Sequence, residues 1–251
     1  MALLRNAAEV ERPAPPVSLP DRVAILLDFD GTLVELAPNP SDIVIAPTLI
    51  PLLNALSDRL GGRIAIVSGR DVATLVGFGL GAFTLIGSHG AEIQPAHASD
   101  VHYAPTPDLS LIAGQLHAFA ASRPGVLVET KTHGMALHYR QVPQCEDEAR
   151  ALAHSLAKEA DLFVQEGKMM VELRSSGIDK GIAITRLMGT APFTGHYPIF
   201  LGDDVTDETG FDAVNALNGR GVLVGPDRDS HAGYRLANVD AVHRWLGEIV
   251  K

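Results

Sequence analysis

A chain of 251 residues is long enough for one large domain or for a core domain that carries a smaller insertion. Its hydrophobic content of 46% and charged content of 20% are typical of a folded globular protein and exclude a disordered one. The formal net charge of -10 argues against nucleic acid or an anionic membrane as the main partner, because both attract basic surfaces. A phosphate group could still bind where a few cations and backbone N–H groups gather.

Little in the sequence indicates a secreted or membrane protein. The single cysteine, Cys145, excludes an intrachain disulfide and suits a reducing compartment. No apolar run approaches the ~20 residues of a membrane helix, and the N-terminal stretch is too polar for a signal peptide. We therefore expect a cytoplasmic protein whose residues 1–20 form a flexible N-terminal arm.

From residue 23 the chain alternates short apolar runs with amphipathic stretches, which is the pattern of a parallel sheet with crossover helices. The predicted strands are Val23–Leu27, Ile64–Val67, Thr84–Ile86, Pro198–Leu201, Gly221–Val224 and a short one at Leu236–Val239. The predicted helices are Thr48–Leu60, Asp71–Val76, Asp179–Met188, Asp207–Leu217 and Asp240–Val250. Residues 21–98 and 175–251 are thus predicted to form one doubly wound α/β core.

Residues 99–174 follow a different pattern. After a linker that begins past Ile93, two helices are predicted, and each precedes a pair of strands. The helices are Leu109–Ser122 and Glu146–Ala160, and the strand pairs are Val126–Thr130 with Met135–Arg140 and Leu162–Gln165 with Met169–Arg174. Because the strands of each pair are joined by a short turn, we expect antiparallel hairpins in an α+β module inserted into the core.

The strongest chemical signal is the run Asp28-Phe29-Asp30-Gly31-Thr32, which directly follows the first buried strand. In an open parallel sheet, ligands bind beyond the carboxyl ends of the strands. Two carboxylates that leave a buried strand at this edge are costly unless a positive group lies nearby. An acidic turn that caps a helix is the alternative interpretation, and it loses weight because three further motifs follow in order.

Each of the three later motifs can be interpreted either as part of a binding site or as an ordinary structural feature. Ser68-Gly69-Arg70 precedes a helix and could bind an anion through its hydroxyl and backbone N–H groups, although a plain N-cap would look the same. Lys180 opens a helix, where a cation is unfavourable without a compensating anion, but it could also be an exposed lysine. Four acids within Asp203–Glu208 would repel one another, and an oxygen-only set with few protein ligands suits Mg²⁺.

The ordered set of motifs resembles the haloacid dehalogenase (HAD) superfamily. Its four motifs appear here as Asp28–Thr32, Ser68, Lys180 and the acidic run from Asp203 to Asp207. The resemblance implies a Rossmann-like core with a parallel sheet and an inserted cap with antiparallel strands. It also implies a phosphatase in which Asp28 attacks phosphorus and Asp30 acts as general acid and base.

The same resemblance implies a role for each motif residue. Mg²⁺ would be held by Asp28, the backbone carbonyl of Asp30 and Asp203, while Asp204 and Asp207 would orient its waters and Lys180. The residues expected to contact the phosphoryl group are Ser68, Lys180, Thr32 and Gly69. A second aspartate at position 30 favours phosphatase chemistry over dehalogenation, because an alkoxide leaving group needs a proton.

Four further stretches resemble the trehalose-6-phosphate phosphatase family. They are Gly87–Glu92, Glu129–Lys131, Ala136–Arg140 and Gly167–Arg174. By this resemblance the sugar-binding residues are Glu129, Lys131, Lys168 and Glu172, and further candidates for sugar or phosphate contacts are His89, Arg70 and Arg140. The alternative is ordinary cross-strand or surface pairing of Lys131 with Glu129 or of Lys168 with Glu172. For His89 the alternative is a structural place in a glycine-rich turn.

These resemblances imply a Mg²⁺-dependent phosphatase that hydrolyses a small sugar phosphate, trehalose 6-phosphate, to trehalose and phosphate. We expect a monomer with a trehalose-6-phosphate synthase as its functional partner. The nearest alternative is another capped HAD phosphatase, for example one acting on sucrose 6-phosphate; a non-catalytic sugar-phosphate sensor would not need both Asp28 and Asp30. A dinucleotide-binding enzyme is disfavoured because the glycines of Gly77–Gly81 follow a helix rather than a strand. A serine hydrolase is disfavoured because neither Ser68 nor Ser88 lies in a Gly-x-Ser-x-Gly motif.

Overall fold

The computed structural model of the chain describes residues 12–37, 42–104, 108–131, 133–167 and 169–251. Contacts within the chain divide it into two compact units. The core unit comprises Met1–His102 and Asp179–Lys251, and the inserted unit comprises Tyr103–Ile178. These boundaries fall a few residues after the predicted positions 99 and 174.

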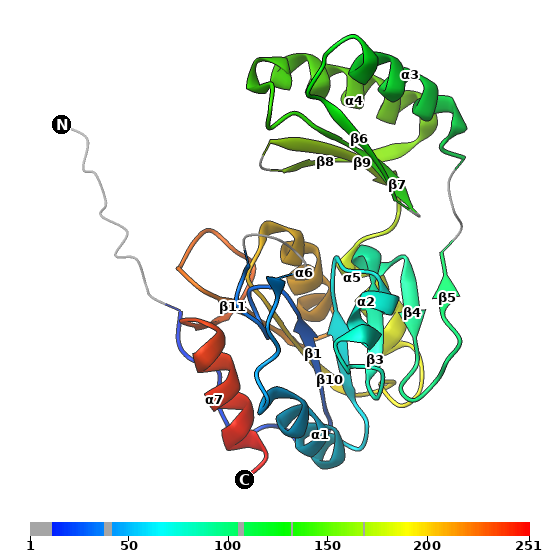
Figure 1. The fold of residues 1–251 in the computed structure, drawn as a ribbon. Helices are drawn as coiled ribbons and strands as arrows, with labels where there is room; N and C mark the ends of the chain where they lie inside the picture. Colours follow the sequence, from blue (N-terminus) through cyan, green and yellow to red (C-terminus); the bar gives the residue numbers. More distant parts are fainter. Residues whose placement is uncertain (1–11, 38–41, 105–107, 132, 168) are drawn as a thin grey trace, which may run out of the picture. The chain divides into compact units, whose positions relative to one another are not determined.

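The core unit is built on an eight-stranded sheet with the order β12-β11-β10-β1-β2-β3-β4-β5 (Figure 1). The strands from β12 to β3 in this order pair in parallel. Their bounds are β1 Val23–Asp28, β2 Ile64–Val67, β3 Thr84–Gly87, β10 Tyr197–Gly202, β11 Arg220–Val224 and β12 Tyr234–Leu236. The predicted α/β core with a parallel sheet is therefore confirmed.

The linker predicted after Ile93 is present only in part: residues 95–101 form no helix or strand, but two more strands extend one edge of the core sheet. They are β4 (Glu92–Gln94), which pairs antiparallel with β3, and β5 (His102–Tyr103). The side chain of Glu92 is buried, and its carboxylate accepts hydrogen bonds from the Val72 N–H (2.8 Å) and from Ser88 Oγ (2.7 Å). Tertiary hydrogen bonds thus place polar residues inside, against the usual hydropathy pattern.

Helices cover both faces of the core sheet. One face carries α1 (Leu49–Leu60), α2 (Val72–Gly77) and α7 (Val239–Ile249), and the other carries α5 (Lys180–Met188) and α6 (Glu208–Ala216). Side chains of β1 alternate between the two faces: Ile25 and Leu27 pack with α1 and α7, and Ala24 and Leu26 pack with α5 and α6. Because the strands are buried on both sides, they read as continuous apolar runs in the sequence.

Side-chain caps determine where the helices near the sheet edge begin. The Asp179 carboxylate accepts from the Ile182 N–H (2.8 Å), which makes Lys180 the first residue of α5. Asn238 caps α7 in the same way, so residues predicted to lie in the last strand lead into this helix instead. Among the described residues, no helix combines the length and apolar character needed to cross a membrane.

The inserted unit contains a four-stranded antiparallel sheet with the order β6-β7-β9-β8. Two helices pack against one face of this sheet through a separate hydrophobic core. The bounds are β6 Leu127–Lys131, β7 Gly134–His138, β8 Leu162–Gly167, β9 Met170–Ser175, α3 Ser110–Ala121 and α4 Glu146–Ala160. The predicted α+β module with antiparallel strands is confirmed, although β7 ends before Arg140.

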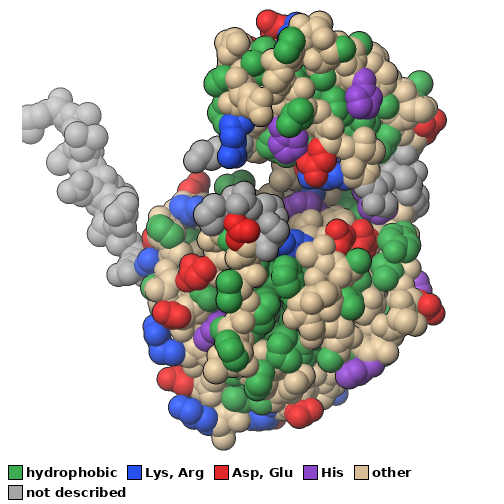
Figure 2. Space-filling model, viewed as in Figure 1, with side chains coloured by type: hydrophobic (Ala, Val, Ile, Leu, Met, Phe, Trp, Pro, Cys, Tyr) green, Lys and Arg blue, Asp and Glu red, His purple; other side chains and the backbone are tan. Residues whose placement is uncertain are grey.

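The second face of the inserted sheet is polar. Glu129, Ala136, Glu172 and Gln165 are partners in one row across the four strands, and therefore share a face. Apolar residues such as Leu137 alternate with them and fill the core under the helices. Figure 2 shows acidic, basic and histidine side chains gathered along the edge of this unit where its strands lie in Figure 1.

The predicted flexible arm, residues 1–20, lies partly outside the described residues. From Arg12 onward the chain is hydrogen-bonded to the core unit. The Pro13 carbonyl accepts from the Arg235 N–H (3.0 Å), and the Pro16 carbonyl accepts from Trp245 Nε1 (3.2 Å). The described part of this segment is thus attached to β12 and α7.

Candidate active site

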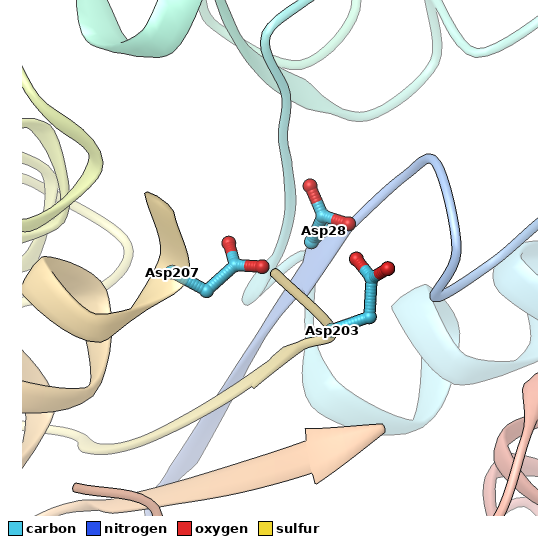
Figure 3. Close-up of side chains that lie close together, drawn as sticks. All are labelled: Asp28, Asp203 and Asp207. Carbon is cyan, nitrogen blue, oxygen red and sulfur yellow. The ribbon is translucent and has the colours of Figure 1, made fainter. Parts of the chain in front are cut away.

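Three carboxylates meet at the carboxyl edge of the core sheet. Asp28 ends β1, Asp203 directly follows β10, and Asp207 closes the 3₁₀ turn Val205–Asp207 that comes next. One carboxylate oxygen of each lies within 4.8 Å of the others, and Figure 3 shows the carboxylates of Asp28 and Asp203 turned toward one another. They meet because β1 and β10 are paired neighbours whose ends lie at the same edge.

Two glycines make room for these acids. Gly31 has a φ of +82°, and a Cβ at this position would lie 2.1 Å from Asp203 Oδ2. A Cβ on Gly202 would lie 2.6 Å from Asp207 Oδ2. Any larger residue at either position would collide with a carboxylate, so the glycines of both motifs are needed for the close approach.

Lys180 bridges two of the acids from the start of α5. Its Nζ donates to Asp28 Oδ1 and to Asp207 Oδ1, each at 2.7 Å, and all three side chains are buried. Although burial lowers the pKa of Lys180, the two carboxylates raise it above its ordinary value. The second oxygen of Asp207 accepts from the Asp204 N–H (3.0 Å), so Asp207 ties Lys180 to the acidic loop.

The site has the features of a cation site. Asp28 Oδ2 is buried, and no described group donates a hydrogen bond to it. Burial raises the pKa of Asp28 well above its ordinary value, and Lys180 offsets only part of this effect. Burial, with repulsion from Asp207 and Asp204, raises the pKa of Asp203 to about 6. A divalent cation would relieve all three penalties, and the oxygen-only donor set fits Mg²⁺.

Arg70 contacts Asp30, although the sequence had suggested a contact with substrate. Its Nε and Nη2 donate to the two carboxylate oxygens of Asp30 at 2.7 and 2.8 Å. The guanidinium also lies over the rings of Phe29 and Phe78, 5.8 and 5.5 Å from their centroids. Nearby, the Thr32 hydroxyl is buried and has no partner among the described residues, so it is free to donate to a ligand.

Ser68 and His89 belong to two loops that are hydrogen-bonded together. The Ser68 hydroxyl is buried and accepts from the Arg70 N–H (3.1 Å). The N–H groups of Ser88 and His89 donate to the carbonyls of Arg70 (2.8 Å) and Ser68 (2.9 Å). The His89 ring lies against Gly69, where a Cβ would come within 2.6 Å of Cε1. The Ser88-His89 turn is therefore hydrogen-bonded to the Ser68-Gly69-Arg70 loop, which the sequence predicts to bind an anion.

Three of the four predicted sugar-binding residues form pairs on the polar face of the inserted sheet. Lys131 Nζ donates to the Glu172 carboxylate at 2.6 Å, and Glu172 is buried. Glu129 lies 2.8 Å from His138 Nε2. Lys131 is thus paired across the sheet with Glu172, from β6 to β9, and not with Glu129 as the alternative from the sequence had it.

Two further predicted residues have exposed positions in the structure. Asp204 is exposed, and its carboxylate accepts from the Val205 N–H (2.6 Å) to cap the 3₁₀ turn. Arg140 is exposed and follows the end of β7. Lys168 lies outside the described residues. The predicted metal role of Asp204 and the predicted substrate contact of Arg140 stay predictions.

Sequence reasoning missed Arg228, which lies in the loop of residues 225–233 between β11 and β12 (the β11–β12 loop). Its Nη2 donates to the Asp204 carbonyl (2.8 Å), and its Nη1 pairs with the Glu208 carboxylate. Burial raises the pKa of Glu208, but the hydrogen bonds that it accepts lower the pKa by more and hold it below its ordinary value. The donors are the His231 N–H, Ser230 and Arg228. No sequence motif includes Arg228, so only the fold could bring it to the acidic loop.

Comparison with known proteins agrees with this geometry. The sequence model of the trehalose-phosphatase family matches residues 26–240. The chain belongs to the trehalose-phosphatase family. It is therefore a phosphoric monoester hydrolase, as Asp28 at the end of β1 and Asp30 just after it had indicated.

Proteins similar to this chain in sequence or in fold match it over most of its length. The chain is 39% identical over 229 residues to the trehalose-6-phosphate phosphatase of Escherichia coli, covering 90% of this chain and 85% of that protein. Its fold is similar to that of the C-terminal domain of the Candida albicans trehalose-6-phosphate phosphatase, with a TM-score of 0.81, 24% identity, and coverage of 95% and 98%. A haloacid dehalogenase-like hydrolase from Bacteroides thetaiotaomicron has a TM-score of 0.69 at 15% identity, over 92% and 100% of the two chains. The core-plus-cap fold of the HAD superfamily is confirmed.

Replacing Asp203 in this trehalose-phosphatase family member should separate metal binding from stability. In the metal-free protein the carboxyl of Asp203 has a pKa of about 6 against an ordinary 3.8, so stability falls as pH rises from 4 through 6. At pH 7.5 with EDTA, we expect Asp203→Asn to unfold a few degrees higher than wild type, for a gain of about 1–2 kcal/mol.

The same thermal-unfolding measurement is repeated with Mg²⁺. Wild type should gain stability on adding the ion and Asp203→Asn should gain none. A variant that is less stable than wild type in EDTA, or that responds equally to Mg²⁺, would contradict the metal-site interpretation.

Proposed function

We propose that the chain is a Mg²⁺-dependent phosphatase that hydrolyses trehalose 6-phosphate to trehalose and phosphate through an aspartyl-phosphate on Asp28. The observation that carries this proposal is the position of Asp28, which has one oxygen on Lys180 and the other buried without a donor, beside Asp203. The names of the relatives support the substrate. We place the protein in the cytoplasm as a monomer, with a trehalose-6-phosphate synthase supplying its substrate.

The first half of the reaction transfers the phosphoryl group to Asp28. Asp28, Asp203 and the Asp30 carbonyl would hold the Mg²⁺, which neutralises charge beside the phosphate dianion and steadies the charge of the transition state. An oxygen of Asp28 attacks phosphorus, the bond from phosphorus to the sugar oxygen breaks, and Asp30 gives its proton to that oxygen. Trehalose leaves, and an acyl phosphate remains on Asp28.

In the second half, water removes the phosphoryl group. Asp30, now a carboxylate, takes a proton from the water as its oxygen attacks phosphorus. The bond from phosphorus to Asp28 breaks, which returns the Asp28 carboxylate and releases inorganic phosphate. Lys180 and the hydroxyls of Ser68 and Thr32 bind phosphoryl oxygens during both steps. Asp207 keeps its hydrogen bond to Lys180 when Asp28 is esterified, and this holds the ammonium in place.

Arg70 acts in this scheme through Asp30. Its two hydrogen bonds fix both oxygens of the Asp30 carboxylate, so they set the position from which Asp30 reaches the leaving oxygen. A bidentate arginine engages a carboxylate, whereas the protonated acid has lost one acceptor oxygen. Asp30 must therefore exchange part of this pairing when it takes up its proton. Arg70 is a positioning residue in this proposal rather than a contact to sugar.

The polar face of the inserted sheet would bind the distal glucose. Glu129, Lys131 and Glu172 share this face, and their carboxylates accept from sugar hydroxyls while the ammonium donates to them. The pair Lys131–Glu172 keeps Glu172 buried and charge-compensated before the sugar arrives. Lys168, which lies outside the described residues, is proposed as a fourth contact.

Asp28→Asn should abolish phosphate release, because an amide oxygen is a poor nucleophile and loses the charge that Lys180 and the cation require. We expect a loss of about 10³-fold or more in kcat for trehalose 6-phosphate. Phosphate release is measured for trehalose 6-phosphate, sucrose 6-phosphate and glucose 6-phosphate, each with Mg²⁺ or with EDTA.

Asp58→Asn, an exposed site on α1, serves as the matched control and should behave as wild type. Retained turnover by Asp28→Asn would rule out the assigned nucleophile. Equal turnover of all three sugar phosphates by wild type would rule out trehalose 6-phosphate as the preferred substrate.

Asp30→Asn and Arg70→Met should be most harmful with poor leaving groups. A sugar alkoxide needs the proton from Asp30, whereas p-nitrophenolate leaves without it. For trehalose 6-phosphate we expect Asp30→Asn to lose about 10²- to 10⁴-fold in kcat, and Arg70→Met a smaller share of the same loss.

With p-nitrophenyl phosphate, both losses should shrink together, and Arg70→Lys should fall between wild type and Arg70→Met. If Arg70→Met instead lowers kcat/KM equally for the two substrates, Arg70 contacts the phosphate and does not act through Asp30.

Lys131→Ala and Glu172→Ala should raise KM for trehalose 6-phosphate far more than for p-nitrophenyl phosphate, which has no distal glucose. Since the two side chains form one pair, the double variant should lose less than the sum of the single losses in free energy. Arg123→Ala, which removes a surface ion pair elsewhere in the inserted unit, provides the control. Equal changes in KM for both substrates would refute the sugar-binding assignment.

A further inference from the structure

Arg12 connects the N-terminal segment, here residues 12–20, to the β11–β12 loop by hydrogen bonds and an ion pair. Its guanidinium donates to the carbonyls of Ala232 (2.8 Å), Arg228 (2.9 Å) and Ser230 (2.7 Å), and it pairs with the Asp227 carboxylate. Four acceptors from one loop thus converge on a single, mostly buried side chain. Because the guanidinium is planar and rigid, these bonds fix the shape of the loop and not only its distance from the segment.

The same loop holds the acidic loop of residues 203–208 at two points. Arg228 donates to the Asp204 carbonyl (2.8 Å) and pairs with Glu208. Glu208 also accepts from Ser230 Oγ (3.2 Å) and from the His231 N–H (2.8 Å). These contacts lie at either end of the stretch that carries Asp207 and directly follows Asp203.

The N-terminal segment has its own attachment to the core. Pro13 and Pro16 accept hydrogen bonds from β12 and from Trp245 of α7, as described above. In Figure 1 the blue segment that follows the grey trace runs beside α7. Arg12 therefore reaches the β11–β12 loop from a fixed base.

We infer that Arg12 and Arg228 are positioning residues for the cation site, with the N-terminal segment bracing the β11–β12 loop and that loop bracing the acidic loop. The inference rests on the proposed function, because it takes the acids to be cation ligands. The physical reason is the crowding of Asp28, Asp203 and Asp207, whose like charges favour an outward movement of the acidic loop. A brace that opposes this movement preorganises the ligands and lowers the free energy of ordering them on binding.

A purely structural staple is the rival explanation, and it predicts a different result. Loss of such a staple lowers the free energy of unfolding but leaves the affinity of the folded protein for Mg²⁺ unchanged. Loss of a brace lowers the affinity itself. The affinity for Mg²⁺ alone, measured without substrate, therefore separates the two explanations.

The test uses the full chain and isothermal calorimetry with Mg²⁺ at pH 7.5, with thermal unfolding in EDTA and in Mg²⁺ as a second readout. Mutation of residues that hold metal ligands in place typically lowers the affinity for the metal by about 10- to 100-fold. We expect Arg228→Met to raise the Kd for Mg²⁺ by about 10-fold and Arg12→Met by a smaller factor. The double variant should match Arg228→Met, because Arg12 acts only through the loop that Arg228 belongs to.

Arg63→Met is the matched control. Arg63 also binds a backbone carbonyl, that of Val23 (3.1 Å), but at the amino end of β1, the edge opposite the acids. It should lower the unfolding temperature without changing the Kd. If Arg12→Met is too unstable to measure, Arg12→Lys replaces it. A lysine keeps the charge but cannot bind all three carbonyls, so the Kd should still rise above that of wild type, by less than in Arg228→Met.

An unchanged Kd in the Arg12 and Arg228 variants, with a lower unfolding temperature, would overturn the inference and leave Arg12 a structural staple. The proposed function would survive that result. Failure of the wild-type protein to bind Mg²⁺ would overturn both.

Discussion

The buried group of Asp28, Lys180 and Asp207 is the interaction on which the rest of the site depends. A buried ammonium between two buried carboxylates is stable only when all three are present, since removing one leaves a charge without compensation. The three residues come from β1, α5 and the turn after β10. They join the two halves of the core that the inserted unit separates in the sequence. The same contacts leave one oxygen of Asp28 without a donor among the described residues, so stability and reactivity arise from one arrangement.

Much of the core could be predicted because its strands are buried on both faces. Each strand then reads as an apolar run, and the residue at its carboxyl end must face the ligand edge. Partners across the fold could not be predicted. Arg70 and Asp30 are forty positions apart, and nothing in either motif shows that they pair. The strand β4 was missed for a related reason, because the buried Glu92 carboxylate accepts from the Val72 N–H, twenty positions away, as well as from the nearby Ser88.

In the inserted unit, the alternation of apolar and polar residues predicted the strands, whereas the pairing of the charged residues could not be predicted. The predicted strand Val126–Thr130 contains Glu129 but ends before Lys131, whereas the structure includes both residues in β6. Only the strand order β6-β7-β9-β8 shows that Glu172 lies on the same face, close enough to pair with Lys131. A cross-strand ion pair and a sugar contact are therefore not exclusive interpretations. The pair stabilises a buried carboxylate in the free protein, and hydroxyl groups of a sugar could take over part of its hydrogen bonding.

The account is tested most directly by a crystal structure of the protein with Mg²⁺ and beryllofluoride, a mimic of an acyl phosphate. It predicts beryllium bonded to the carboxylate of Asp28, one Mg²⁺ shared by Asp28 and Asp203, and Lys180 still bound to Asp207. Beryllofluoride on another residue, or a metal ion bound away from Asp28, would contradict it.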